Sequence, residues 1–147
     1  MHGRAVVKIG VTGTRSGMNT KQRREVTEFL RATAPDKERI LHEGDCVGVD
    51  DEVAEIAAEL GYRIVVHPPV SAENRAFRTG NENREPKTHF ARNRSIVDES
   101  DVVVVVPFQN EHQDRGGTWY THDYAVKKKK RVIVFYPDAD MFDISGD

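Results

Sequence analysis

Val102-Val103-Val104-Val105-Val106 is apolar and β-branched at every position. A run of this length without a polar residue is typical of a strand that is covered on both faces, as in a parallel sheet. After a polar segment it leads to Gly116-Gly117-Thr118 and then to a helical pattern that ends near Lys128. A buried strand, a glycine turn and a helix in this order predict a strand–helix unit with free backbone N–H groups at the helix start.

Strand and helix patterns alternate through the rest of the chain. Short apolar runs predict strands at residues 5–11, 39–42, 62–66 and 132–135, and helical spacing predicts helices at 20–32, 49–60, 89–98 and 118–128. In the helix at 89–98, Phe90, Ile96 and Val97 are expected to point inward. The segment 70–88 is polar and without a period, which is typical of a functional or mobile loop.

This alternation predicts an α/β fold with right-handed crossovers. We expect a single Rossmann-like domain at residues 1–136, built from about five mostly parallel strands that are flanked by helices. Residues 137–147, which carry four aspartates and few order signals, are expected to form an acidic C-terminal tail. We see no internal repeat and no second domain.

The composition excludes several classes of protein. The net charge of −2 does not favour nucleic acid as a partner, and no run approaches the roughly 20 apolar residues of a membrane span. Cys46 is the only cysteine, so an internal disulfide cannot form, and we expect a cytoplasmic protein without a membrane partner. The six histidines show no metal-ligand spacing, so neither a metal site nor a cofactor is predicted.

A second glycine turn, Gly13-Thr14-Arg15-Ser16-Gly17, directly follows the first strand. In open α/β sheets, ligands bind at the carboxyl ends of the strands where the strand order reverses, so the two glycine turns should face one another if the first and fourth strands are neighbours. Each turn feeds a helix N-terminus, which favours an anion, and Arg15 adds a planar fork suited to phosphate. The simpler interpretation is that these glycines only permit tight turns.

Other candidates carry a similar choice of interpretations. Arg92 and Asn93 could reach into the cleft or belong to a solvated helix face. Asp50 could accept a hydrogen bond from a ribose hydroxyl or favour the dipole of its helix. Trp119 could stack on a base, although aromatic residues at a helix start more often pack on the core. The basic run 127–131 is interpreted as a solvated helix end.

The motifs together resemble those of the SLOG superfamily of Rossmann-like domains. The resemblance runs from Ala5 to about Phe135 and rests on the order of its short motifs: Thr12-Gly13-Thr14-Arg15, then 42–50 (His-Glu-Gly-Asp-Cys-Val-Gly-Val-Asp), Ala91-Arg92-Asn93, Asp101 and Gly117-Thr118. The superfamily includes the DNA-processing DprA proteins, the Lonely Guy nucleotide hydrolases and a small YspA-like branch of bacterial and phage proteins, to which this chain is most similar. The resemblance implies that a nucleotide or a nucleotide-derived ligand binds in the cleft, and it adds Gly44 and Asp45 to the candidates.

One departure from the family pattern concerns catalysis. The Lonely Guy motif Pro-Gly-Gly-x-Gly-Thr-x-x-Glu ends in a glutamate that helps to cleave an N-glycosidic bond, and nucleoside deoxyribosyltransferases have a similar helix. Here Gly117 and Thr118 match, but Thr121 stands at the position of the glutamate. A threonine hydroxyl is a poor nucleophile without a base, although Asp45, Asp50 or Asp114 could compensate from another loop.

The sequence therefore predicts binding ahead of cleavage. The leading hypothesis is a sensor or sequestering protein for a phosphoribosyl-containing ligand, with no catalytic residue assigned. The alternatives are a nucleoside-monophosphate N-glycosidase or (deoxy)ribosyltransferase, and a DprA-like DNA-binding module that uses 127–131 and the arginine-rich segment 75–94. Because relatives often assemble, a homo-oligomer is expected. The predicted ligand-binding residues are Gly13, Thr14, Arg15, Ser16, Gly17, Gly44, Asp45, Asp50, Arg92, Asn93, Gly116, Gly117, Thr118 and Trp119.

Overall fold

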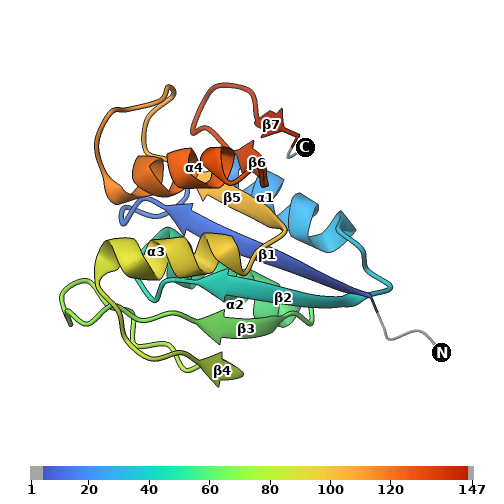
Figure 1. The fold of residues 1–147 in the computed structure, drawn as a ribbon. Coiled ribbons are helices and arrows are strands. Elements are labelled where there is room, and N and C mark those ends of the chain that lie inside the picture. Colours follow the sequence, from blue (N-terminus) through green and yellow to red (C-terminus); the bar gives the residue numbers. More distant parts are fainter. Residues whose placement is uncertain (1–4, 146–147) are drawn as a thin grey trace.

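A computed structural model describes residues 5–145, so that residues 1–4 of the expected domain and 146–147 of the expected tail lie outside it. Strands and helices alternate along most of the chain (Figure 1). The elements are β1 (Val6–Gly13), α1 (Thr20–Ala32), β2 (Glu38–Glu43), α2 (Val49–Glu59), β3 (Arg63–Val66), β4 (Glu82–Asn83), α3 (His89–Asp98), β5 (Val102–Val106), α4 (Gly117–Lys127), β6 (Arg131–Val134) and β7 (Phe142–Ile144). The α/β fold that the sequence predicts is confirmed.

The strands form one sheet in the order β4-β3-β2-β1-β5-β6-β7. All neighbouring pairs are parallel except β6 and β7, which are antiparallel. The strand order reverses between β1 and β5, which pair directly, with Gly13 opposite Val106 at their carboxyl ends. The neighbouring placement that the sequence analysis assumed for these strands is therefore correct.

The expected number of about five strands is too low by two, because β4 and β7 were not predicted. Each has only two or three residues and carries acidic or amide side chains. Segments this short have no period of their own, and they become strands by pairing with the edges that β3 and β6 offer. The segment that was expected to be a tail thus contributes β7 to the sheet.

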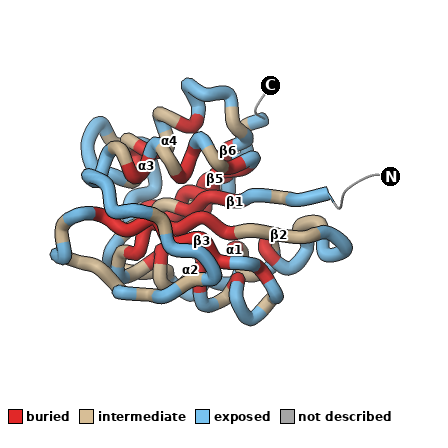
Figure 2. Tube along the Cα trace, turned by 60° about the horizontal axis from the view of Figure 1, so that its bottom comes forward, coloured by how far each residue is buried: buried red, intermediate tan, exposed pale blue. Residues whose placement is uncertain are grey.

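Two helices cover each face of the sheet, and the central strands are buried between them (Figures 1 and 2). Val102, Val104 and Val106 of β5 pack with α1 and α2, whereas Val103 and Val105 pack with α3 and α4. The side chains of a strand alternate between faces, so a strand that is covered on both sides must be apolar throughout. This is the physical reason for the valine run.

The start of α1 joins the ends of two central strands. Asn19 caps the helix in a reciprocal capping box with Gln22. Gln22 is buried, and its amide nitrogen donates hydrogen bonds to the carbonyl oxygens of Pro107 (2.9 Å) and Phe135 (3.0 Å), which follow β5 and β6. The buried amide of Gln22 therefore has two carbonyl partners inside the core.

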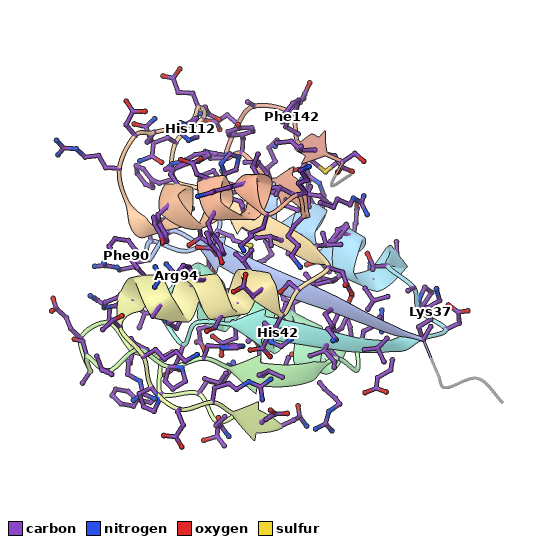
Figure 3. All side chains as sticks on the ribbon, in the orientation of Figure 1. Lys37, His42, Phe90, Arg94, His112 and Phe142 are labelled. Carbon is purple, nitrogen blue, oxygen red and sulfur yellow. The ribbon has the colours of Figure 1, made fainter. Side chains whose placement is uncertain are left out.

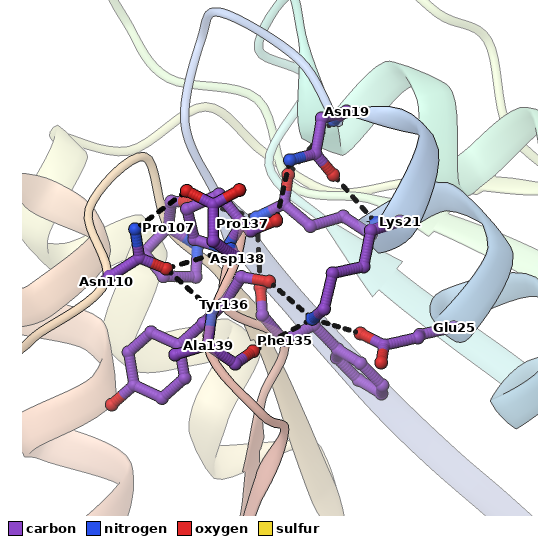
Figure 4. A network of polar contacts seen from close by, with 11 residues as sticks. Asn19, Lys21, Glu25, Pro107, Asn110, Phe135, Tyr136, Pro137, Asp138 and Ala139 are labelled. Atoms are coloured by element: carbon purple, nitrogen blue, oxygen red, sulfur yellow. Dashed lines mark hydrogen bonds and ion pairs between the residues drawn. The ribbon is translucent and has the colours of Figure 1, made fainter.

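The segment after β6 is held to the same helix (Figure 4). The amide of Asn19 donates a hydrogen bond to the carbonyl oxygen of Pro137 (2.7 Å), and the ammonium group of Lys21 donates to those of Tyr136 (3.1 Å) and Ala139 (2.8 Å). In addition, Asn110 accepts hydrogen bonds from two backbone N–H groups of this segment. These contacts order the chain that leads into β7.

Among residues 5–145, no helix combines the length and the apolar character that crossing a membrane requires.

Replacing Gln22 with leucine should destabilise the fold strongly. Gln22→Leu keeps a similar side-chain volume but leaves two buried carbonyl groups without a donor, so the free energy of unfolding should fall by about 2 to 4 kcal/mol. Urea unfolding followed by circular dichroism measures the change. The matched control is Arg24→Leu on the exposed side of α1, which should stay within about 0.5 kcal/mol of the wild type. Equal effects of the two substitutions would contradict the role of Gln22.

Candidate functional site

A cavity of about 410 Å³ opens at the carboxyl ends of β1 and β5, where the strand order reverses. The segments after these strands diverge, because β1 leads to α1 on one face and β5 leads to α4 on the other. Residues from both segments, from the start of α2 and from α3 line the cavity: Val11, Thr12, Gly13, Thr14, Arg15, Cys46, Asp50, Asn74, His89, Phe90, Arg92, Asn93, Ile96, Gly117, Thr118 and Thr121.

The turn after β1 forms the first wall. The backbone N–H of Thr14 donates a hydrogen bond to the carbonyl oxygen of Val106 (3.0 Å), which ties the turn to β5. A Cβ atom at Gly13 would lie 2.5 Å from Cγ1 of Val49, so only glycine lets this turn approach α2 so closely. Arg15 is exposed on the cavity wall, where its guanidinium is free to meet a ligand.

The start of α4 forms the second wall. Gly116 adopts a positive φ of 97°, and no side chain caps the helix that follows. Gly117 and Thr118 therefore bring uncapped backbone N–H groups and the positive end of the helix dipole to the cavity. Thr121 is buried at the cavity wall, and its hydroxyl donates a hydrogen bond to the carbonyl oxygen of Gly117 (2.8 Å).

Two polar residues of α3 form the third wall. Arg92 is buried, and its guanidinium donates hydrogen bonds to the side-chain oxygen of Asn93 (2.6 Å) and to the carbonyl oxygens of Gly44 and His67. A guanidinium held in this way is a fixed positive charge, which differs from the solvated helix face that was the alternative. The next arginine of α3, Arg94, is exposed instead, and its guanidinium donates a hydrogen bond to the hydroxyl of Tyr120.

Asp50 faces the same cavity from the first turn of α2. Burial raises the pKa of its carboxyl group to about 6, although the guanidinium of Arg92 acts in the opposite direction. A Cβ atom at Gly44 would lie within 3 Å of both Nη1 of Arg92 and Oδ2 of Asp50, so the missing side chain lets these opposite charges share one corner. Near neutral pH the cavity therefore holds a fixed cation and a carboxyl group that is close to its titration point.

Asp45 has a structural position beneath the cavity. Its carboxylate is fully buried, and it accepts hydrogen bonds from Nε of Arg75 (2.7 Å) and from the backbone N–H of Arg78 (2.9 Å). The guanidinium of Arg78 in turn pairs with Asp51 and Glu55 of α2. Asp45 thus fastens the polar loop between β3 and α3, and this loop supplies Asn74 to the cavity.

The predicted ligand-binding residues divide into two groups. Those on the cavity are Gly13, Thr14, Arg15, Asp50, Arg92, Asn93, Gly117 and Thr118. Those not among its lining residues are Ser16, Gly17, Gly44, Asp45, Gly116 and Trp119. Trp119 is only 3% exposed, and its indole N–H donates a hydrogen bond to Gln109 (3.1 Å), so it packs in the core instead of offering a face for stacking.

Phe90 is the aromatic residue that the sequence analysis missed. It was expected to point inward, but its side chain is 53% exposed and lies at the cavity rim. Phe90 and Arg94 project from α3 toward α4 (Figure 3), where the rings of Phe90 and Tyr120 lie 4.4 Å apart. The apolar periodicity of α3 correctly predicted that Ile96 and Val97 are buried. It could not show that Phe90, in the first turn of the helix, is exposed beside α4.

Comparison with known proteins gives structural likeness only. No protein-family model matches the chain, and no curated protein sequence matches it significantly. Among solved structures, the molybdenum cofactor binding protein from Rippkaea orientalis matches with a TM-score of 0.68 and 22% identity, over 91% of this chain and 78% of that protein. The molybdenum cofactor carrier protein from Chlamydomonas reinhardtii matches with a TM-score of 0.62 and 23% identity, over 88% and 76%.

DNA-processing proteins share the same architecture. DprA from Streptococcus pneumoniae matches with a TM-score of 0.63 and 18% identity over 88% of this chain, which spans 50% of the length of DprA. At these identities the likeness establishes the fold and nothing further. The chain has the Rossmann-like fold of DprA and the molybdenum cofactor carriers, as its resemblance to the SLOG superfamily predicts.

Proposed function

We propose that this protein binds a phosphorylated, nucleotide-derived ligand in the cavity between β1 and β5, as a sensor or sequestering protein. The observation that carries the proposal is the convergence of two glycine turns and a buried arginine on one cavity of about 410 Å³. A site of this size accommodates a small organic ligand. Its charged and backbone donors favour an anion.

The phosphate would lie between the two glycine turns. Backbone N–H groups at the start of α4 would donate to it, and the exposed guanidinium of Arg15 would close over it from the opposite wall. Arg92 would contribute a positive charge that is already immobilised by its hydrogen bonds. Little side-chain entropy is then lost when the ligand binds, which favours affinity.

The nucleoside part would extend toward α3. Phe90 offers an exposed ring at the rim for a base, and Asp50 offers a carboxylate that can accept a hydrogen bond from a ribose hydroxyl. The names of two structural neighbours support a small-molecule ligand, because both refer to binding or carrying the molybdenum cofactor.

Binding ranks ahead of cleavage because of Thr121. Its hydroxyl donates its proton to the carbonyl oxygen of Gly117 and is buried, so it offers neither the charge nor the nucleophile of a catalytic glutamate. DNA binding ranks lower as well, since the net charge is −2 and the DprA proteins share only the fold with this chain.

One observation favours a second function, an N-glycosidase acting on nucleoside monophosphates. Asp50 is a buried carboxyl group on the cavity with a pKa raised to about 6, which suits a residue that exchanges a proton near neutral pH. Incubation with common nucleoside monophosphates should then release free base that chromatography detects, and Asp50→Asn should abolish the release. If no base appears, binding without cleavage stands alone.

Arg15 allows a test of the proposed phosphate contact. Calorimetry against nucleoside monophosphates, cyclic nucleotides and ADP-ribose should find at least one ligand, and Arg15→Gln should weaken its binding about tenfold because a charge-assisted hydrogen bond is lost. The matched control is Arg31→Gln at the exposed end of α1, which should bind as the wild type does. Absence of binding at millimolar concentration across the panel would overturn the proposal.

The second prediction concerns the base. Phe90→Ala should weaken binding of a nucleotide by roughly tenfold, while binding of ribose 5-phosphate should stay the same, because only the nucleotide has a base to stack. Phe108→Ala is the control, since Phe108 is 66% exposed and is not among the cavity residues. Equal losses for both ligands would assign Phe90 a structural role.

The third prediction concerns pH. Because the pKa of Asp50 is raised to about 6, its carboxylate becomes protonated as the pH falls through that value, and the neutral carboxyl group accepts a weaker hydrogen bond from a ribose hydroxyl. Binding of ADP-ribose, whose phosphates stay ionised in this range, should therefore weaken between about pH 7.5 and pH 5. Asp50→Asn should bind more weakly at pH 7.5 and lose this dependence, and an unchanged pH profile in the variant would exclude Asp50 as its source.

A further inference from the structure

A cluster of three metal-ligating side chains lies outside the cavity. His42 belongs to β2, His67 follows β3, and Glu99 is the C-terminal cap of α3. One ligand atom from each lies within 4.8 Å of the others, and Nδ1 of His42 is 2.9 Å from Nε2 of His67. His42 is on the sheet face that α3 covers (Figure 3). The cluster therefore joins two strands and a helix.

The two imidazoles are buried and face each other. Burial lowers the pKa of His42 and of His67 to about 4, so that both rings are neutral near pH 7. Each neutral ring carries one lone pair, and the two facing nitrogens can share only one proton. Nε2 of His42 is buried without a hydrogen-bond partner in residues 5–145. Among the described residues, the ring of His42 therefore has one polar contact, which Nδ1 makes with His67.

Glu99 gives the cluster a carboxylate and an opening. Its side chain is 35% exposed, so the cluster reaches the surface of the protein at this residue. The guanidinium of Arg84 pairs with Glu99, and it also pairs with Glu82. Arg84 therefore supplies the positive charge beside Glu99 in this structure. If a metal ion replaced Arg84 at Glu99, the guanidinium would still pair with Glu82.

We propose that His42, His67 and Glu99 form a binding site for Zn²⁺. Two imidazole nitrogens and one carboxylate oxygen are a donor set that suits zinc, whereas Mg²⁺ and Ca²⁺ prefer oxygen ligands alone. Ligand nitrogens around a tetrahedral zinc ion lie about 3.3 Å apart, so the observed 2.9 Å needs only a small separation of the rings. Water would complete the coordination on the exposed side.

A second cluster serves as the internal comparison. His112, His122 and Asp123 also bring ligand atoms within 4.8 Å, but one carboxylate oxygen already accepts a hydrogen bond from each imidazole at 2.8 Å. Two of its side chains are 42% and 56% exposed, so water competes for these two ligands. The buried cluster should therefore bind the ion more tightly.

The sequence gives little signal for this site. His42 and His67 are 25 residues apart and belong to neighbouring strand ends, so no motif of closely spaced ligands appears. A zinc ion there would also act on the neighbouring cavity, because the carbonyl oxygen of His67 accepts a hydrogen bond from Arg92. The metal site does not depend on the proposed ligand of that cavity.

The test is a calorimetric titration of the metal-free protein with Zn²⁺ alone. A second titration uses Co²⁺, whose visible absorption spectrum indicates whether the site is tetrahedral. Glu99→Gln should weaken zinc binding at least about tenfold, because it removes a charged ligand. Arg84→Gln should tighten it several-fold, because it removes the competing cation. The double variant His112→Gln and His122→Gln should bind as the wild type does at the buried site.

Opposite shifts in the Glu99 and Arg84 variants support the proposal, since no merely structural defect changes affinity in both directions. Both side chains are partly exposed, so these variants should keep the circular dichroism spectrum of the wild type. The proposal is wrong if zinc does not bind at micromolar concentration, if Glu99→Gln binds unchanged, or if the double variant loses binding. In that last case the exposed cluster is the zinc site.

Discussion

The parallel pairing of β1 with β5 is the constraint on which the rest of the structure depends. Gly13 and Val106 lie opposite each other at the carboxyl ends of these strands, and the N–H of Thr14 continues the ladder to Val106. Because the chain leaves β1 toward one face of the sheet and leaves β5 toward the other, the segments that follow the two strands separate at this edge. The cavity is a consequence of this divergence, and the two glycine turns meet there because each lies between one of the two strands and the helix that follows it.

Much of the fold could be predicted because its central elements carry strong local patterns. The helix bounds His89–Asp98 and the valine strand were predicted without error, since burial on one helix face or on both strand faces leaves a readable period. β4 and β7 could not be predicted, because Glu82–Asn83 and Phe142–Ile144 have too few residues for a period. Their conformation comes from hydrogen bonds to neighbouring strands, and those neighbours are known only when the sheet is assembled.

The sequence predicts which loops form the candidate site, but it does not predict the direction of each side chain. Motifs at the carboxyl ends of strands must gather at one edge of a parallel sheet, so Arg15, Arg92 and Gly117 meet as expected. The direction of a side chain depends instead on its immediate packing. Asp45, at a positive φ of 59°, turns its carboxylate under the polar loop, and Trp119 turns its indole into the core. Sequence spacing contains neither fact, because both depend on partners far along the chain.

Three buried acidic residues also lie at this edge of the sheet, and their carboxyl groups differ in how their charge is balanced. Asp45 is matched by Arg75, which makes it a structural ion pair. Glu43 makes no ion pair within residues 5–145, and burial and the neighbouring aspartates raise its pKa and favour the neutral acid. Asp50 lies between these cases, because Arg92 offsets only part of its desolvation. A ligand hydroxyl that donated a hydrogen bond to Asp50 would stabilise its carboxylate and lower its pKa, so ligand binding and proton release at this edge are coupled.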